Sequence, residues 1–589
     1  MRRITTAALI VIAALLVVPS AIAGRGGKGK NDNDTRVQLL AFNDLHGNLQ
    51  PPTGSGGRIQ VGVTPAGAPV NVDAGGAEYF ATHIKQLRMQ NTNTIVVAAG
   101  DAIGASPLIS ALFHDEPTIE ALNLWGTDVQ GVGNHEFDEG VDELLRMQYG
   151  DQNGGDGCHP LDGCQDGDAF GGALFQYLAA NVFWKSNDET ILPAYEIRKI
   201  GNAKIAFIGL TLEGTPAIVS QAGIQDVYFT DEVETVNALA RRLRAEQGVR
   251  SFVVLVHEGA IQTAPFAKGF ADINGCENLN GPIVDITKNL DPLVDVVISG
   301  HSHAAYNCLV NGRPLTSASS FGRLITDIDL VIDHESKDVR AVTATNRIVT
   351  RDVAKDPDQT ALLAKYDRLS APIANRIVGR ISADITRAET SAGESALGDV
   401  IADAQQWITS QDHHGGAVVA FMNPGGIRAD LVFNASTGGE APGQVTYREL
   451  FDVQPFTNYV VTKTMTGAQI YRLLEQQWSS GTNATSRRIL QVSAGFTYTY
   501  DGAGINTLPA RTNRVVPGSV KINGVAVDPD ASYRVTMNSF LADGGDNFTV
   551  FREGIDPLVG MIDVDAAVNY FEMKGTVDPG PRNRITRIN

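Results

Sequence analysis

Positive charge is scarce in this sequence of 589 residues, which has 47 Lys and Arg against 66 Asp and Glu. The formal net charge is therefore −19. Such a deficit argues against a nucleic-acid-binding surface and against electrostatic attraction to anionic membranes. It does not exclude an anionic substrate, because bound divalent cations can reverse the local field.

Long apolar runs are missing as well. The N-terminal run, residues 7–18, is well short of the ~20 residues that span a bilayer. It follows Arg2 and Arg3 and precedes Ala21-Ile22-Ala23, a small-x-small cleavage signature. We therefore predict a cleaved signal peptide over residues 1–23 and a secreted or periplasmic protein, and we disfavour the alternative of a membrane anchor. The last residues show no apolar tail for an anchor either.

Cysteine is rare, with four residues and no CxxC spacing, which argues against a thiolate zinc site. Four cysteines in an exported chain fit disulfides. Cys158 and Cys164 bracket a short loop that can close locally, so we expect them to pair, leaving Cys276 for Cys308. Three pairings are formally possible.

The overall composition is that of a globular protein, with 43% apolar and 19% charged residues. The length exceeds what one hydrophobic core usually serves, so we expect two domains. Strand-like apolar runs alternate with helical stretches, and each run ends in polar residues. The predicted strands are residues 37–42, 94–99, 129–132, 252–256 and 296–299, and the predicted helices include 78–89, 231–245, 356–378 and 398–409. This pattern indicates an α/β domain whose strands are buried on both faces and whose ligands lie beyond the carboxyl ends of the strands.

Metal-ligand side chains follow all five of these predicted strands. The donors are Asp44, His46, Asp101, Asn134, His257, His301 and His303. Two carboxylates, four imidazoles and an amide oxygen are about what two divalent cations need, and mixed N/O donors suit Zn, Mn, Co, Fe or Mg. Any one such residue is more often a surface residue than a ligand, and we interpret His83, His114, His159, His334, His413 and His414 in that way. Five strand ends with donors favour a dinuclear site, in which Asp101 is a natural bridging carboxylate.

His135 lies between the donor Asn134 and Asp138, and it is the candidate for proton transfer. Asp138, three residues on, can bond one imidazole nitrogen of His135 and fix its tautomer. A histidine of the core is the alternative, and its polar neighbours disfavour it.

These motifs resemble those of the calcineurin-like metallophosphoesterases. The longer forms Asn43-Asp44-Leu45-His46-Gly47 and Gly133-Asn134-His135-Glu136-Phe137-Asp138 are similar to those of the secreted 5′-nucleotidase group, over nearly the whole mature chain. The resemblance implies a four-layer N-terminal domain, with two sheets flanked by helices, and a separate α+β substrate-binding domain. It implies that Asp44, His46, Asp101 and His303 hold one cation and that Asp101, Asn134, His257 and His301 hold the other. His135 and Asp138 would form a catalytic dyad, and Glu136 would be structural.

The change of character around residues 333–358 marks a domain junction. We predict a metallophosphoesterase domain over 24–352, a helical linker over 353–380 and a substrate-specificity domain over 381–589. The resemblance implies that Phe456 and Phe540 sandwich a base, that Asp546 takes the ribose hydroxyls, and that Arg428 and Asn423 contact phosphate and base. It also implies that this second domain rotates to carry the nucleotide to the metals.

The sequence departs from the family pattern just before Glu394. Many members carry a further phosphate-binding arginine there, whereas this chain has Ser391, Ala392 and Gly393, and Arg387 is the nearest substitute. This departure puts strict 5′-monophosphate specificity in doubt, but not phosphoester hydrolysis.

We therefore predict a metal-dependent phosphoric ester hydrolase of the 5′-nucleotidase type, which releases nucleoside and phosphate. The alternatives are a UDP-sugar diphosphatase or 2′,3′-cyclic-nucleotide phosphodiesterase and, from another class, a non-catalytic secreted metal-binding protein. An extracellular nuclease fits the metals but not the net charge. We expect a nucleotide substrate, no nucleic-acid polymer, no membrane anchor, and a monomer or homodimer.

Overall fold

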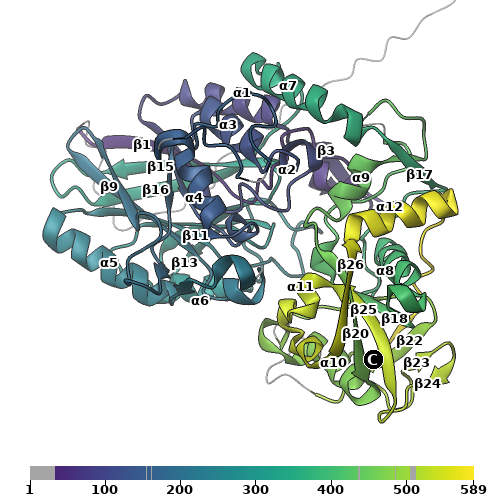
Figure 1. The fold of residues 1–589 in the computed structure, drawn as a ribbon. Coiled ribbons are helices and arrows are strands. Elements are labelled where there is room, and N and C mark those ends of the chain that lie inside the picture. The colour runs from purple at the N-terminus through teal and green to yellow at the C-terminus, as the bar shows by residue number, and fades with distance from the viewer. Residues whose placement is uncertain are drawn as a thin grey trace, which may run out of the picture.

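The N-terminal half of this computed structural model contains two six-stranded sheets (Figure 1). The structure describes residues 33–589 apart from 154, 161, 220, 436–437, 485 and 505–511, so the predicted signal peptide lies outside the described residues. Across those described segments, we find no helix with the length and apolar character needed to cross a membrane.

The first sheet has the order β16-β15-β1-β4-β5-β6, and the second has the order β13-β14-β12-β11-β9-β8. The first comprises β1 (Thr35–Phe42), β4 (Thr94–Ala99), β5 (Val129–Gly131), β6 (Gln176–Leu178), β15 (Leu324–Ile332) and β16 (Val339–Ile348). The second comprises β8 (Tyr195–Ile200), β9 (Ala203–Thr211), β11 (Ser251–His257), β12 (Val296–Ser299), β13 (Ala305–Val310) and β14 (Arg313–Ala318). In the first sheet β1, β4, β5 and β6 run parallel, while β15 pairs antiparallel with β1 and β16 antiparallel with β15. In the second sheet β9, β11, β12 and β14 run parallel, and the edge strands β8 and β13 are antiparallel to their neighbours.

Helices cover the outer face of each sheet, which completes the four layers that the resemblance implied. A shared core that includes Leu39 and Val97 of the first sheet and Phe207 and Leu255 of the second lies between the sheets. The helices α1 (Ala77–Arg88), α3 (Glu116–Trp125) and α4 (Val141–Tyr149) pack on the first sheet, and α7 (Pro357–Ala374) packs on α1 and α3 from outside. The helices α5 (Glu232–Gln247) and α6 (Pro282–Asn289) pack on the second. The five predicted strands are confirmed, and three of them belong to one sheet and two to the other.

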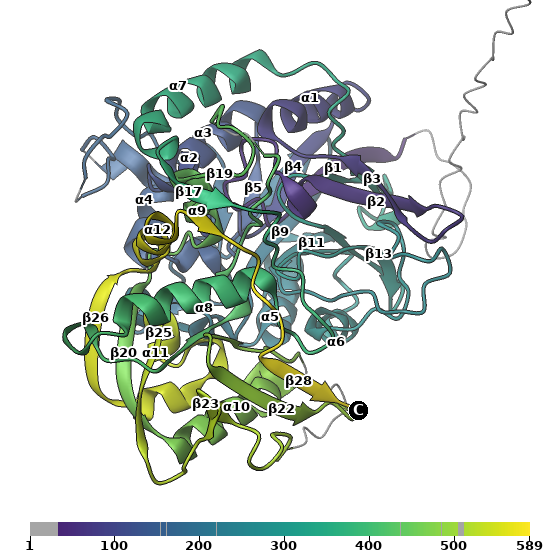
Figure 2. The same ribbon diagram turned by 90° about the vertical axis from the view of Figure 1, so that its right-hand side faces the viewer.

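The C-terminal half is built on a five-stranded sheet of order β21-β18-β25-β20-β26. Its strands are β18 (Val419–Met422), β20 (Tyr459–Thr466), β21 (Gln491–Val492), β25 (Ser532–Asn538) and β26 (Ile555–Ile562). The main helices are α8 (Ala396–Thr409), α10 (Gly467–Ser479) and α12 (Asp563–Lys574), and α8 and α12 lie side by side (Figures 1 and 2). A four-stranded sheet of order β24-β23-β22-β28 carries the end of the chain (Figure 2). Its strands are β22 (Phe496–Asp501), β23 (Lys521–Ile522), β24 (Val525–Ala526) and β28 (Ile585–Ile588).

A short helix of the C-terminal half, α9 (Tyr447–Val453), lies against the N-terminal half. The Leu108 N–H at the start of α2 (Leu108–Ala111) donates to Asp452 Oδ1 over 2.9 Å. Arg448 donates to Gln50 Oε1 and to Asp367 Oδ1, each over 3.0 Å. Both predicted disulfides, Cys158–Cys164 and Cys276–Cys308, are present.

Candidate metal centre and nucleotide pocket

The predicted metal ligands converge because both sheets present the carboxyl ends of their parallel strands at one edge. Asp44 and His46 follow β1, Asp101 follows β4, and Asn134 follows β5; His257 ends β11, while His301 and His303 follow β12. Five of these seven residues have left-handed backbones, with φ of 50° at Asp44, 47° at His46, 51° at Asp101, 67° at His301 and 54° at His303. Residues other than glycine avoid this backbone region, so the surrounding structure must hold these loops in the left-handed conformation.

Two backbone hydrogen bonds and two glycines fix the close packing of these loops. The N–H of Asp44 donates to Gly100 O over 3.1 Å, and the N–H of His46 donates to Asp101 O over 3.0 Å. A Cβ at Gly133 would lie 2.2 Å from Asp101 Oδ1, and a Cβ at Gly100 would lie 2.6 Å from Gly133 N. These two positions of the strand-end motifs therefore require glycine.

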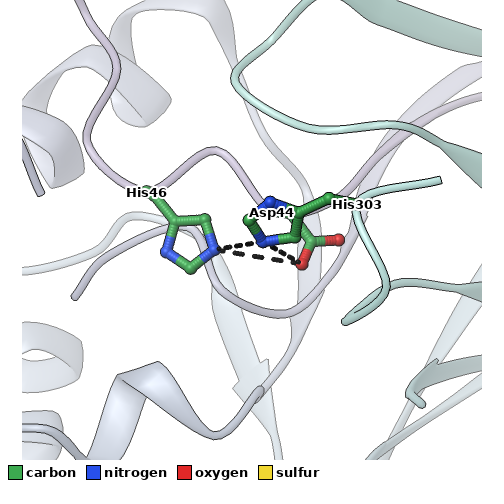
Figure 3. A group of neighbouring side chains, drawn as sticks. All are labelled: Asp44, His46 and His303. Carbon is green, nitrogen blue, oxygen red and sulfur yellow. Dashed lines mark hydrogen bonds and ion pairs between the residues drawn. The ribbon is translucent and has the colours of Figure 1, made fainter. Parts of the chain in front are cut away.

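The first ligand cluster is Asp44, His46 and His303 (Figure 3). The Nε2 atoms of His46 and His303 lie 3.0 Å apart, and Asp44 Oδ1 lies 3.4 Å from His303 Nε2. His46 Nδ1 lies 2.9 Å from Gly104 O. Because a carbonyl can only accept, Nδ1 of His46 carries the proton and its Nε2 presents a lone pair to the cluster.

The second ligand cluster is Asp101, His257 and His301, with Asn134 beside it. His257 Nε2 lies 2.8 Å from Asp101 Oδ2, and His301 Nδ1 lies 2.9 Å from Asn134 Oδ1. His257 Nδ1 is bonded to Ala99 O over 2.7 Å, which again directs Nε2 toward the cluster. Asp101 Oδ2 is also 3.6 Å from His46 Nε2, so this carboxylate lies between the two clusters.

The residues present fit divalent cations. Nε2 of His257 is buried and has no hydrogen-bond partner of normal geometry within the described chain. Burial opposes charge on this imidazole, yet Asp101 and Asp44 outweigh burial and raise the pKa of His257 to about 10. The carboxylates therefore favour a positive charge between them, which a cation would supply. Burial lowers the pKa of His301 to about 3 and that of His303 well below its usual value, so both are neutral and able to ligate.

His135 and Asp138 form the predicted pair, with Nδ1 of His135 at 2.8 Å from Asp138 Oδ2. The backbone N–H of His135 donates to Asp101 Oδ1 over 2.9 Å, which ties the pair to the metal centre. Burial opposes protonation of His135, but the charges of Asp138 and Asp101 outweigh it and raise its pKa. The arrangement suits a proton donor whose tautomer is fixed by a carboxylate.

Glu136 connects two ligand loops from beneath. Its carboxylate accepts the N–H groups of Asp101 over 2.9 Å, Ala102 over 2.8 Å and Gly133 over 2.5 Å. The side-chain amide of Gln130 is a fourth donor, at 3.1 Å. The buried side chain thus supports the ligand loops through hydrogen bonds to their backbone.

A cavity of about 530 Å³ joins the metal centre to the C-terminal half. All five predicted substrate residues line it together with the metal site. The lining includes Asp101, Asn134, His135, His301 and His303 on one side and Asn423, Arg428, Phe456, Phe540 and Asp546 on the other.

Phe456, from the C-terminal half, contacts His135 of the N-terminal half beside the metal-ligand clusters. Its ring centroid lies 5.7 Å from that of His135, with 24° between the planes. The guanidinium carbon of Arg428 lies 5.7 Å over the same ring. Nη2 of Arg428 is buried and lacks a hydrogen-bond partner among the described residues, so it is available to an anion. Asn423 Nδ2 donates to Asp546 Oδ2 over 2.8 Å.

The structure corrects one interpretation and adds residues that sequence reasoning missed. His114 is not a plain surface residue, because its ring nitrogens lie 2.9 Å from Glu139 Oε2 and 2.9 Å from Asp162 Oδ2 and its ring stacks on His159 at 3.6 Å. Arg488 lines the cavity, although no motif marks it in the sequence.

Arg387, the substitute named above for the missing arginine, is not among the cavity-lining residues of the described chain. Its Nε lies 3.9 Å from Asp430 Oδ1. Burial lowers the pKa of Arg428, and the charge of Arg387 adds to that effect, so Arg387 acts on the site from outside the cavity wall.

Comparison with known proteins matches two family models to the two halves. Residues 37–305 match the calcineurin-like phosphoesterase family, and residues 375–553 match the 5′-nucleotidase C-terminal domain. The chain is 32% identical to Endonuclease YhcR of Bacillus subtilis over 91% of its own length and 39% of that protein. It is 30% identical to Cell wall protein Lmo0130 of Listeria monocytogenes, over 96% of this chain and 71% of that one. It thus spans well under half of the first relative and about seven tenths of the second.

A solved structure shares the fold. The 5′-nucleotidase precursor from Thermus thermophilus superposes with a TM-score of 0.73 at 23% identity, over 94% of this chain and 100% of that one. The fold and the pairing of domains are those of metal-dependent phosphoester hydrolases. The chain therefore belongs to the 5′-nucleotidase family, in which a calcineurin-like phosphoesterase domain precedes a 5′-nucleotidase C-terminal domain.

Proposed function

We propose that this protein hydrolyses nucleotide phosphoesters as a 5′-nucleotidase, releasing nucleoside and phosphate. The observation that carries the proposal is one cavity lined by both the phosphoesterase ligands and the candidate nucleotide-binding residues. A phosphoryl group at the metal centre would lie within the same space as a base and ribose held by the C-terminal half.

Two divalent cations fit the donors best, one held by Asp44, His46, Asp101 and His303 and the other by Asp101, Asn134, His257 and His301. The shared Asp101 lies within 3.6 Å of His46 Nε2 and 2.8 Å of His257 Nε2, which favours a bridging role. When bound, such a pair polarises a phosphoryl group and activates water. The N/O donor set is compatible with Zn, Mn, Co, Mg or Fe.

His135 is the proton donor in this proposal. Asp138 holds Nδ1, so the Nε2–H is left to donate to a phosphoryl or leaving oxygen. The charges of Asp138 and Asp101 raise the pKa of His135 against the effect of burial, which favours the protonated form that can donate. Arg428 would bind the phosphoryl oxygens with its unpartnered Nη2.

The C-terminal half would select the nucleoside. Phe456 and Phe540 would stack the base, Asp546 would accept the ribose hydroxyls, and Asn423 would contact the base. A protein exported through the signal at residues 1–23, secreted or periplasmic and acting as a monomer or homodimer, is consistent with this role. The domain limits at 24–352, 353–380 and 381–589 are part of the proposal.

The test is release of phosphate from AMP with Mn²⁺ or Zn²⁺, before and after EDTA. The proposal requires hydrolysis that chelation abolishes and metal restores; activity that survives thorough chelation would contradict it. A panel of ATP, UDP-glucose and 2′,3′-cyclic AMP separates the nucleotidase from the diphosphatase and cyclic phosphodiesterase alternatives. Absence of activity on AMP and on all of these substrates would favour the alternative of a non-catalytic metal-binding protein.

The relative called an endonuclease does not change this proposal. This chain spans 39% of that protein, and the net charge of −19 opposes binding to a nucleic-acid polymer.

A further inference from the structure

Asp546 is held at the cavity wall by other polar side chains. Its backbone is left-handed, at φ 53°, so its placement needs support. Asn423 Nδ2 donates to Asp546 Oδ2 over 2.8 Å, and Arg488 Nε lies 3.4 Å from Oδ1. A carboxylate has about four acceptor positions, so these two contacts leave acceptor capacity for a ligand.

Arg488 and Asn483 close a ring behind this carboxylate. Arg488 Nη1 donates to Asn483 Oδ1 over 2.9 Å. Asn483 Nδ2 donates to the backbone oxygen of Asp546 over 2.8 Å, and Asn483 is buried with 1% of its surface exposed. One asparagine thus holds the backbone of Asp546 and also the arginine that faces its side chain.

The contacts among Asp546, Arg488 and Asn483 act on two properties that a carboxylate needs in order to bind a diol, namely its hydrogen-bond acceptors and its orientation. A carboxylate only accepts hydrogen bonds and therefore suits two hydroxyl donors, and the guanidinium of Arg488 lies 3.4 Å from its Oδ1. The contacts at both oxygens also limit rotation of the carboxylate, and Asp546 lines the cavity. Arg488 itself lines that cavity.

We propose that Arg488, held by Asn483, is a positioning residue that fixes Asp546 for the ribose 2′- and 3′-hydroxyls and so sets a preference for ribonucleotides over 2′-deoxyribonucleotides. The inference rests on the proposed function, because it assumes that the ligand is a nucleotide.

The test compares kcat/KM for AMP and 2′-deoxy-AMP in the metal-loaded wild type and in Arg488→Gln. We expect kcat/KM for AMP to fall roughly 10-fold and that for 2′-deoxy-AMP less than about 3-fold, because a charge-assisted contact to the ribose ligand is lost. Arg488→Lys keeps the charge but not both contacts, so its AMP/2′-deoxy-AMP ratio should fall between those of the wild type and Arg488→Gln.

Arg487→Gln is the matched control. Burial raises the pKa values of Glu389 and Tyr500, and the charge of Arg487 opposes both rises, which places this neighbouring arginine beside those residues. Its substitution should leave the AMP/2′-deoxy-AMP ratio of the wild type unchanged.

The proposal is overturned if Arg488→Gln lowers kcat/KM for AMP and for 2′-deoxy-AMP by the same factor, or if it changes only the melting temperature. It is also overturned if Arg487→Gln shifts the AMP/2′-deoxy-AMP ratio as much as Arg488→Gln does. A wild type that hydrolyses AMP without preferring it to the deoxy form also overturns it while the proposed function stands. A wild type that releases no phosphate from either nucleotide refutes the proposed function and this inference together.

Discussion

At the scale of single residues, we propose that His135 carries the proton transfer. Replacing it by Asn keeps the size and polarity but removes the acid, so we expect kcat to fall by about 10²–10⁴ with metal content unchanged. Steady-state kinetics with AMP, together with metal analysis, check this. Loss of bound metal in His135→Asn would show that the residue serves the metal centre instead.

Glu136 should act through the ligand loops. In Glu136→Gln one acceptor oxygen becomes an amide donor that faces N–H groups. The hydrogen bonds that Oε2 accepts from Asp101 and Gly133 and those that Oε1 accepts from Ala102 and Gln130 therefore cannot all persist. We expect the Kd for Mn²⁺, measured by calorimetry, to rise by about 10–100-fold, as for other residues that support metal ligands. An unchanged Kd in a folded variant would count against this role.

The proposed role of Phe456 is to stack on the base beside His135. Phe456→Ala should raise KM for AMP by about 3–10-fold, since stacking is lost, and should change KM for p-nitrophenyl phosphate much less. Because the ring also contacts His135, we expect a modest fall in kcat for both substrates. Equal changes in KM for the two substrates would argue that no base stacks there.

At the scale of elements, His114 ties the Cys158–Cys164 loop to the turn that carries Glu139. Burial opposes protonation of His114, but Glu139 and Asp162 outweigh it and raise its pKa to about 9 from 6.5. Because the folded pKa is the higher one, this stabilisation is complete below pH 6.5 and is lost as the pH rises through 9.

The consequence is measurable by thermal unfolding across that pH window. The wild type should lose roughly 1 kcal/mol of this contribution between pH 6.5 and 9 after solvent screening, and His114→Asn should not. If the stability of the wild type and that of His114→Asn change in parallel with pH, protonation of His114 does not contribute to folding stability.

The strands that carry the site were predictable from sequence because each is a mainly apolar run that is followed by ligand side chains. The interpretation of His114 was wrong because its partners lie 25 and 48 residues further along the chain, and no local pattern marks such contacts. Arg488 was missed for the same reason, since its place at the cavity depends on how its segment packs beside Asn483 and Asp546.

At the scale of the whole molecule, two halves meet around one cavity, and α9 anchors the C-terminal half through Asp452 and Arg448. The division into a calcineurin-like phosphoesterase part and a 5′-nucleotidase C-terminal part followed from sequence motifs. How the halves contact one another did not, because it depends on pairs such as Leu108 and Asp452, 344 residues apart.

The central claim is that seven side chains from both sheets bind a pair of cations that share Asp101. Elemental analysis of the purified wild type and of Asp101→Asn, after equilibration with Mn²⁺ and removal of free ions, tests it most directly. The account predicts two ions per chain in the wild type and fewer than one in the variant, with the fold of the variant retained by circular dichroism. A wild type that holds one ion or none at saturation, or an Asp101→Asn that still holds two, would contradict it.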